Sequence, residues 1–256
     1  MPLAIDLYCG LGGWTDGLTA EGYDVIGFDN KQHVYGEHRY PAQLVIQDVL
    51  TLHGSQFKDA TLIVASPPCE EFSYMAMPWS RAKALAADYR SGRRDVRKLT
   101  ALFDACFRIQ REASEAAGRH VPLIVENVRG AQPWVGPARW RFGSFFLWGD
   151  IPALMPAPTK DVKVPGFRFD GSGRSFQSAS VEGCKSDGGT WFGDYSAMKE
   201  GVKQRGSGRE WFAGAGKISR MTSSKSRARK MASAMIAKIP IQLSRHVARS
   251  YLAASP

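Results

Sequence analysis

A lone cysteine, Cys69, follows two prolines at the end of a short apolar run. The run LIVAS, residues 62–66, predicts a buried strand, and the prolines restrict the backbone directly before the thiol. A turn that carries an inert, buried cysteine would explain this stretch. A thiol held rigidly at a strand end is equally suited to act as a nucleophile if its surroundings favour the thiolate.

Polar residues also follow other predicted strands. The strand over residues 3–8 runs into the glycine-rich stretch DLYCGLGG, residues 6–13. Asp29 ends a second strand and Asp48 a third. Glycines let the backbone approach a nucleotide-like ligand, and carboxylates can accept hydrogen bonds from a ribose or an adenine amino group. Because Thr15 stands where the dinucleotide fingerprint needs glycine, the pattern favours a small adenosyl ligand over a pyrophosphate.

A glutamate and two arginines complete the set of candidate residues. Glu126 directly follows the apolar run VPLIV, and burial there would raise its pKa and make it a proton donor near neutral pH. An ion pair with Arg129 explains Glu126 equally well. Arg139 and Arg141 alternate before the next predicted strand, so they share a face and can address one target. On its own, such an arginine pair is typical of a protein surface.

The elements that position these residues alternate along the first half of the chain. Short apolar strands are separated by helical patterns, of which residues 95–117 form the longest. This alternation predicts an α/β fold with a Rossmann-like, doubly wound and mostly parallel sheet, whose ligands bind beyond the carboxyl ends of the strands. We expect a catalytic domain over residues 1–150, a small irregular lobe over 151–222, and C-terminal helices over 223–256, broken near Pro240.

Positive charge is concentrated in the last part of the chain. Residues 1–159 hold 16 Lys and Arg against 17 Asp and Glu, a net charge of −1. Residues 160–256 hold 18 against 7, a net charge of +11. Such segregation predicts that the irregular lobe faces a polyanion such as a nucleic acid.

Composition excludes several other classes of protein. No apolar run in the 256 residues reaches the length of a membrane span, and the start lacks the features of a signal peptide. The four cysteines form no CxxC pair and no histidine cluster accompanies them, so we expect neither a zinc site nor a disulfide framework. We expect a cytoplasmic, monomeric protein without a metal or a membrane partner.

In order along the chain, these motifs resemble the cytosine-5 DNA methyltransferase family of phage and bacterial type. DLYCGLGG resembles the family's opening motif, PPCEEFS its nucleophile motif, ENV its Glu-Asn-Val element and RWR its Arg-x-Arg element. MIAKIPIQLSRHVA resembles the last motif, a helix that returns to the cofactor side of the catalytic domain, although the usual Gly-Asn is missing.

The resemblance implies both a reaction and roles for individual residues. Cys69 would attack carbon 6 of a flipped-out cytosine in double-stranded DNA, and carbon 5 would take a methyl group from S-adenosylmethionine. Glu126, Arg141 and Arg139 would hold the base, Asn127 would position the proline–cysteine loop, and Ser73 would contact a phosphate. The implied cofactor-binding residues are Asp6, Tyr8, Gly10, Leu11, Gly12, Asp29, Asp48 and Pro67.

Two other functions compete with this hypothesis. Some relatives with small target lobes modify tRNA, so the same chemistry on RNA is the nearest alternative. A non-catalytic nucleic-acid-binding homologue is disfavoured because Cys69, Glu126 and both arginines are present. A dinucleotide oxidoreductase is disfavoured by Thr15 and by the basic lobe.

Overall fold

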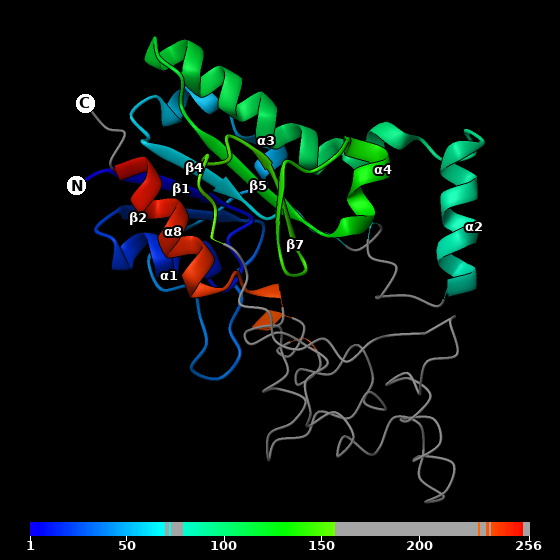
Figure 1. Ribbon diagram of the computed structural model, residues 1–256, viewed down its shortest axis with the longest axis horizontal. Coiled ribbons are helices and arrows are strands. Elements are labelled where there is room, and N and C mark those ends of the chain that lie inside the picture. Colours follow the sequence, from blue (N-terminus) through cyan, green and yellow to red (C-terminus); the bar gives the residue numbers. More distant parts are fainter. Residues whose placement is uncertain (70–71, 73–78, 157–229, 231–233, 236, 253–256) are drawn as a thin grey trace, which may run out of the picture. The chain divides into compact units, whose positions relative to one another are not determined.

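Figure 1 shows the computed structural model of the protein. The structure describes residues 1–69, 72, 79–156, 230, 234–235 and 237–252. The chain divides into two compact units, Met1–Ala157 with Ile239–Pro256, and Pro158–Lys238. Ser73 and residues 157–222 of the expected basic lobe lie outside the described residues, as does most of the helical pattern that begins at Ser223.

A seven-stranded sheet forms the centre of the first unit, in the order β3-β2-β1-β4-β5-β7-β6. The first five strands in this order pair in parallel, and β7 and β6 pair antiparallel at one edge. This arrangement confirms the predicted α/β fold with a mostly parallel sheet. The strands span Leu3–Leu7 (β1), Asp24–Asp29 (β2), Gln43–Ile46 (β3), Leu62–Ala65 (β4), Leu123–Asn127 (β5), Trp140–Phe142 (β6) and Phe145–Gly149 (β7).

Helices cover both faces of the sheet. The long helix α3 (Val96–Ala117) lies on one face, and α1 (Gly13–Ala20) and α8 (Ile241–Leu252) lie side by side on the other (Figure 1). Asp95 caps the start of α3 by accepting a 2.9 Å hydrogen bond from the Arg97 amide. The remaining described helices are α2 (Trp79–Arg90) and α4 (Gln132–Val135), with 3₁₀ turns at Val49–Thr51, Gly54–Phe57 and Arg129–Ala131.

Successive side chains of the buried strands point to opposite faces of the sheet and pack into two separate hydrophobic cores. In β4, Ile63 and Ala65 join the core beneath α3, whereas Leu62 and Val64 join the core beneath α1 and α8. All four side chains are fully buried, as a strand covered on both faces requires. The continuous apolar run before Cys69 is therefore explained by a central strand.

The C-terminal helix α8 is fastened to α1 by charge and by close packing. Glu21, which follows α1, pairs with Arg245 at 2.5 Å and with Arg249 at 2.8 Å. A methyl group on Gly17 would lie 2.1 Å from the Ser244 hydroxyl oxygen, so only glycine allows this approach. Residues from the end of the chain thus complete one face of the N-terminal sheet.

The structure differs from the sequence-based expectations at three points. The third strand ends at Ile46 rather than at Asp48, because the Asp48 carboxylate accepts a 3.0 Å hydrogen bond from the Leu50 amide and begins a 3₁₀ turn. Arg141 precedes the predicted strand, β7, but itself lies within the edge strand β6, which was not predicted. Helix α2 was not anticipated, because its alanine-rich sequence lacks a clear apolar stripe.

In the described part of the chain, no helix is long and apolar enough to cross a membrane.

Candidate active site

The carboxyl ends of the parallel strands bring most of the predicted site residues to one edge of the sheet. β1, β2, β4 and β5 are neighbours and run in the same direction. The glycine-rich turn therefore follows β1, Asp29 ends β2, Cys69 follows β4, and Glu126 and Asn127 end β5. These residues therefore lie at the carboxyl edge of the strands, where doubly wound sheets bind their ligands.

The glycine-rich turn after β1 adopts left-handed backbone conformations. The φ angles of Tyr8, Gly10 and Gly12 are 57°, 53° and 73°. A Cβ atom on Gly10 would meet nothing nearer than the Tyr8 carbonyl oxygen at 4.0 Å, so space lies open above this backbone. An open backbone surface of this kind fits an adenosyl ligand such as S-adenosylmethionine.

Asp29 is tied directly to this turn. The Gly10 amide donates a 3.1 Å hydrogen bond to Asp29 Oδ2, and His33 lies 3.6 Å from Oδ1. Burial alone would raise the pKa of Asp29, but the hydrogen bonds from His33 and the Gly10 amide hold this pKa below its usual value. Asp29 is therefore ionised at neutral pH and can still accept hydrogen bonds from ribose hydroxyls.

The other predicted cofactor residues differ in their exposure. Asp48 is exposed, while Leu11, Gly12 and Pro67 are buried. Tyr8 donates its hydroxyl hydrogen to the Leu102 carbonyl oxygen at 2.8 Å, which ties the turn to α3. Asp6 lies fully buried beneath the turn and accepts a 2.6 Å hydrogen bond from the Thr15 hydroxyl.

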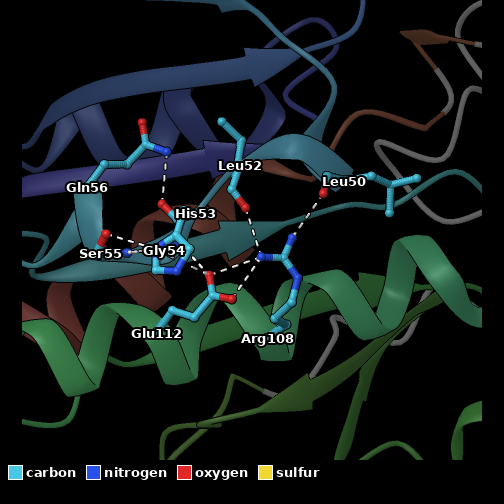
Figure 2. A network of polar contacts seen from close by, with 8 residues as sticks. All are labelled: Leu50, Leu52, His53, Gly54, Ser55, Gln56, Arg108 and Glu112. Carbon is cyan, nitrogen blue, oxygen red and sulfur yellow. Dashed lines mark hydrogen bonds and ion pairs between the residues drawn. The ribbon is translucent and has the colours of Figure 1, made fainter.

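The segment that follows Asp48 is held by two residues of α3 that the sequence did not single out (Figure 2). Arg108 donates to the carbonyl oxygens of Leu52, at 2.8 Å, and Leu50, at 3.3 Å. Glu112 accepts a 2.6 Å hydrogen bond from the Gly54 amide and pairs with Arg108 at 3.0 Å. An arginine and a glutamate four residues apart in a helix gave only a generic signal, since such pairs are usually exposed.

The loop that carries Cys69 is joined to the end of β5. Asn127 is buried and donates a 3.0 Å hydrogen bond from Nδ2 to the Pro67 carbonyl oxygen. Its Oδ1 accepts a 2.8 Å hydrogen bond from the Val128 amide, which fixes the orientation of the side chain. Cys69 is partly buried, and its carbonyl oxygen accepts from the Phe72 amide at 3.0 Å. The thiol is thus mounted on a loop that a neighbouring strand supports.

Glu126 carries a strongly perturbed carboxyl group. The side chain is 9% exposed, and burial raises its pKa to about 8, although a hydrogen bond with Ser66 partly offsets this rise. Ser66 also accepts a 3.1 Å hydrogen bond from the Trp14 indole. Within the described residues, no ion pair joins Glu126 to Arg129, so the alternative explanation from the sequence is wrong. Near neutral pH this carboxyl group can donate a proton.

Arg139 and Arg141 lie at the antiparallel edge and are exposed. The Arg139 amide donates to the Leu147 carbonyl oxygen at 2.9 Å, and Arg141 pairs with Phe146, which in turn pairs with Asn127. Residues directly opposite in neighbouring strands point to the same face, so Arg141 shares the face of Asn127. Glu126 pairs with Leu147 and points to the other face. Among the described residues, no hydrogen bond joins these arginine side chains to Glu126.

The described ranges contain no cluster of three or more His, Cys, Asp or Glu residues that could hold a metal ion. The chemical groups gathered at the sheet edge are instead a thiol, a carboxyl group with a raised pKa, an ionised aspartate and an open glycine backbone. This set can combine nucleophilic attack, proton donation and binding of an adenosyl group.

The chain is similar to several solved methyltransferase structures. A protein described as a DNA modification methyltransferase encoded within an E. coli prophage is 24% identical; the match covers 51% of this chain but only 33% of that one, with a TM-score of 0.35. The Entamoeba histolytica methyltransferase EhMeth is 10% identical over 100% of this chain and 99% of its own, with a TM-score of 0.48. The S. pombe Dnmt2 methyltransferase is 12% identical over the full length of both chains, again with a TM-score of 0.48.

No curated protein sequence matches the chain. The family model of C-5 cytosine-specific DNA methylases matches residues 3–132, about half of the chain. The matched range includes the glycine-rich turn, Cys69 and Glu126, and it ends before Arg139 and Arg141. The protein therefore belongs to the family of C-5 cytosine-specific DNA methylases.

Proposed function

We propose that the protein transfers a methyl group from S-adenosylmethionine to carbon 5 of cytosine in double-stranded DNA. The observation that carries this proposal is the hydrogen bond from Asn127 to the Pro67 carbonyl oxygen. It joins the loop of Cys69 to the strand end that bears Glu126, so a nucleophile and a proton donor share one edge of the sheet. A cytosine-5 methyltransferase needs this pair because carbon 5 of cytosine is too weak a nucleophile without activation.

The cofactor would bind at the glycine-rich turn. The open backbone at Gly10 would approach the amino acid part and the ribose, and the ionised Asp29 would accept the ribose hydroxyls. Asp48 would accept from the adenine amino group through Oδ2, since Oδ1 already accepts from the Leu50 amide. S-adenosylmethionine supplies an electrophilic methyl group on its sulfonium.

The residues of the chain would perform the remaining steps. The Cys69 thiolate forms a bond to carbon 6 of the base, and the electron pair displaced from the 5,6 double bond makes carbon 5 nucleophilic. Glu126 donates its proton toward N3 as negative charge builds there. Arg141, assisted by Arg139, would hold the exocyclic oxygen from the face of the sheet opposite to Glu126. After carbon 5 has taken the methyl group, its proton passes to water, the 5,6 double bond re-forms as Cys69 leaves as the thiolate, and N3 returns its proton to Glu126.

Access to the base requires the rest of the protein. In a duplex the face of carbon 6 is stacked, so the target nucleotide must rotate out of the helix. The lobe over residues 151–222 would recognise the target, with Ser73 contacting a phosphate. Of the net charge of +11 in residues 160–256, +4 lies in residues 160–222 and +7 in residues 223–256, which supports phosphate contacts by both segments. The C-terminal segment over residues 223–256 would pack back on the catalytic domain, as α8 does on α1.

The proposal is tested by methyl transfer to duplex DNA and to tRNA, measured side by side with isotopically labelled S-adenosylmethionine. We expect transfer to DNA by the native protein and none by Cys69→Ala, which should still bind DNA. Transfer to tRNA alone would replace the DNA proposal by its RNA alternative. Full activity of Cys69→Ala would exclude the covalent mechanism.

A second measurement traps the covalent step itself. With DNA that carries 5-fluorocytosine, the fluorine on carbon 5 cannot leave as a proton does, so Cys69 cannot be eliminated. We expect a denaturation-resistant protein–DNA complex with the native protein and none with Cys69→Ala.

The affinity for DNA should also weaken steeply as the salt concentration rises, since lysine and arginine displace counterions from phosphates.

A further inference from the structure

Three buried side chains form a hydrogen-bonded row beneath the glycine-rich turn. The Thr15 hydroxyl donates to Asp6 Oδ2 at 2.6 Å and lies 2.7 Å from the Tyr40 hydroxyl oxygen. Threonine has one hydroxyl hydrogen, and because it goes to Asp6, Tyr40 must donate to Thr15. The relative exposures are 1% for Asp6, 0% for Thr15 and 7% for Tyr40. The direction of this row is therefore Tyr40 to Thr15 to Asp6.

The ring of Tyr40 presses against two glycines that border the turn. A Cβ atom on Gly27, in β2, would lie 2.3 Å from Tyr40 Cζ. A Cβ atom on Gly12, in the turn itself, would lie 2.5 Å from Pro41 Cδ and 3.3 Å from Tyr40 Cδ2. Real Cβ atoms do not approach other atoms so closely, so the Tyr40–Pro41 segment is packed directly on the backbone of both elements.

The same segment lies where it can control the left-handed conformation of the turn. Gly12 has a φ angle of 73° and precedes α1, whose buried Thr15 is the middle member of the row. Asp6 pairs with Gly27 across β1 and β2, so the Tyr40 ring covers a position at which both strands meet. Tyr40 thus packs close to Gly12 of the turn and is hydrogen-bonded to Thr15 in the first turn of α1, the helix that the turn enters.

We propose that Tyr40 and Thr15 are positioning residues for the binding of S-adenosylmethionine. The two residues fix the glycine-rich turn in the conformation that exposes the Gly10 backbone. This inference rests on the proposed function, because the turn must be the cofactor site. Neither hydroxyl is exposed, so both act through the turn and not by contact with the cofactor. Without the row, the left-handed turn relaxes toward other conformations, and binding must first restore it.

The test compares cofactor affinity in variants that lose one hydroxyl of the row. Tyr40→Phe and Thr15→Val should each raise the Kd for S-adenosylmethionine, measured by calorimetry, about tenfold, the size of one buried hydrogen bond. Thr15→Ser keeps the hydroxyl and should keep the affinity. The KM for the cofactor should rise in parallel, while kcat and the KM for DNA remain unchanged.

A matched control separates positioning from stability. Tyr23 is also a buried tyrosine, 3% exposed, and its hydroxyl donates to the Ala248 carbonyl oxygen at 3.1 Å, at the opposite end of β2 from Asp29. Tyr23→Phe should lower the melting temperature about as much as Tyr40→Phe but leave the Kd for S-adenosylmethionine unchanged.

The outcomes distinguish this inference from the proposed function. If the native protein does not bind S-adenosylmethionine, the proposed function itself fails. If the native protein binds and Tyr40→Phe binds as tightly as Tyr23→Phe, only the positioning role is overturned. If Thr15→Val does not fold, the comparison of Tyr40→Phe with Tyr23→Phe decides the question alone.

Discussion

Asn127 at the end of β5 donates a hydrogen bond to the carbonyl oxygen of Pro67, two residues before Cys69. The contact is buried and joins residues 60 positions apart in the sequence. A hydrogen bond from the Val128 amide to Asn127 Oδ1 holds the Asn127 side chain in this orientation. The contact therefore couples the conformation of the thiol-bearing loop to a rigid central strand. The position of a nucleophile strongly affects the reaction rate, since a displacement of about 1 Å can reduce the rate roughly a hundredfold.

The first prediction concerns this coupling. In Asn127→Asp the Nδ2 donor is lost and a carboxylate faces the Pro67 carbonyl oxygen, so the loop is repelled from β5. We expect single-turnover methyl transfer to slow about a hundredfold, with little change in the Kd for S-adenosylmethionine. Gln56→Glu makes the same chemical change at a side chain that donates to the His53 carbonyl oxygen at 2.9 Å and should leave the rate unchanged. Equal rates in the two variants would contradict the coupling.

The strands of the candidate site were predictable because their sequences are short, apolar and followed by polar residues. The ends of β1, β2, β4 and β5 fell within one or two residues of their predicted positions, and parallel pairing then brings them to one edge. The predicted end of β3 lay two residues too late, because the capping hydrogen bond of Asp48 competes with the strand.

The supporting contacts could not be read from the sequence. Tyr40 meets Thr15 over 25 residues, and Glu112 meets Gly54 over 58 residues. Neither pair stands in a periodic pattern, and each forms only after the sheet has brought distant loops and helices together. The glycines were the one available signal, since Gly12, Gly27 and Gly54 are positions at which any side chain would collide with these partners.

The second prediction follows from the raised pKa of Glu126. A carboxyl group with a pKa of about 8 keeps its proton at neutral pH and loses it as the pH rises through 8. The single-turnover rate should therefore show a falling limb near pH 8. Glu126→Gln can still donate a hydrogen bond but cannot transfer a proton, and its rate should fall about 10²–10⁴-fold with that limb removed. If the rate of Glu126→Gln still falls near pH 8, the titration belongs to another group.

The third prediction concerns stability and Asp6. Burial raises its pKa from 3.8 to about 7, with further increases from the charges of Asp29 and Asp16, while the Thr15 hydrogen bonds lower it. Because the pKa is higher in the folded state, the stabilising effect is complete below pH 3.8 and is lost as the pH rises through about 7. Asp6 Oδ1 is buried and has no hydrogen-bond partner among the described residues, which makes the ionised form costly.

The melting temperature should accordingly fall between about pH 4 and pH 7 in the native protein, and less steeply in Asp6→Asn, which cannot ionise. Asp24→Asn, at the exposed start of β2, is the control and should follow the native curve. The same slope in Asp6→Asn and the native protein would show that Asp6 is ionised throughout this range.

The last prediction concerns the clamp of α3 on the segment after Asp48. Glu112→Ala leaves the buried Gly54 amide without its acceptor and Arg108 without its carboxylate partner, and should lower the free energy of unfolding by about 1–3 kcal/mol. Glu115→Ala, an exposed position on the same helix, is the control and should lower the free energy of unfolding far less.

The charge of Glu112 also makes this contribution depend on pH. Burial raises the pKa of Glu112, but the hydrogen bonds from the Gly54 amide and Arg108 outweigh the effect of burial and hold the pKa below 4.5. The ionised Glu112 therefore stabilises the fold above pH 4.5, and this contribution is lost as the pH falls through its lowered folded pKa. The stability difference between the native protein and Glu112→Gln should narrow in acid; a constant difference from pH 7 to pH 3 would mean that the charge of Glu112 does not hold the segment.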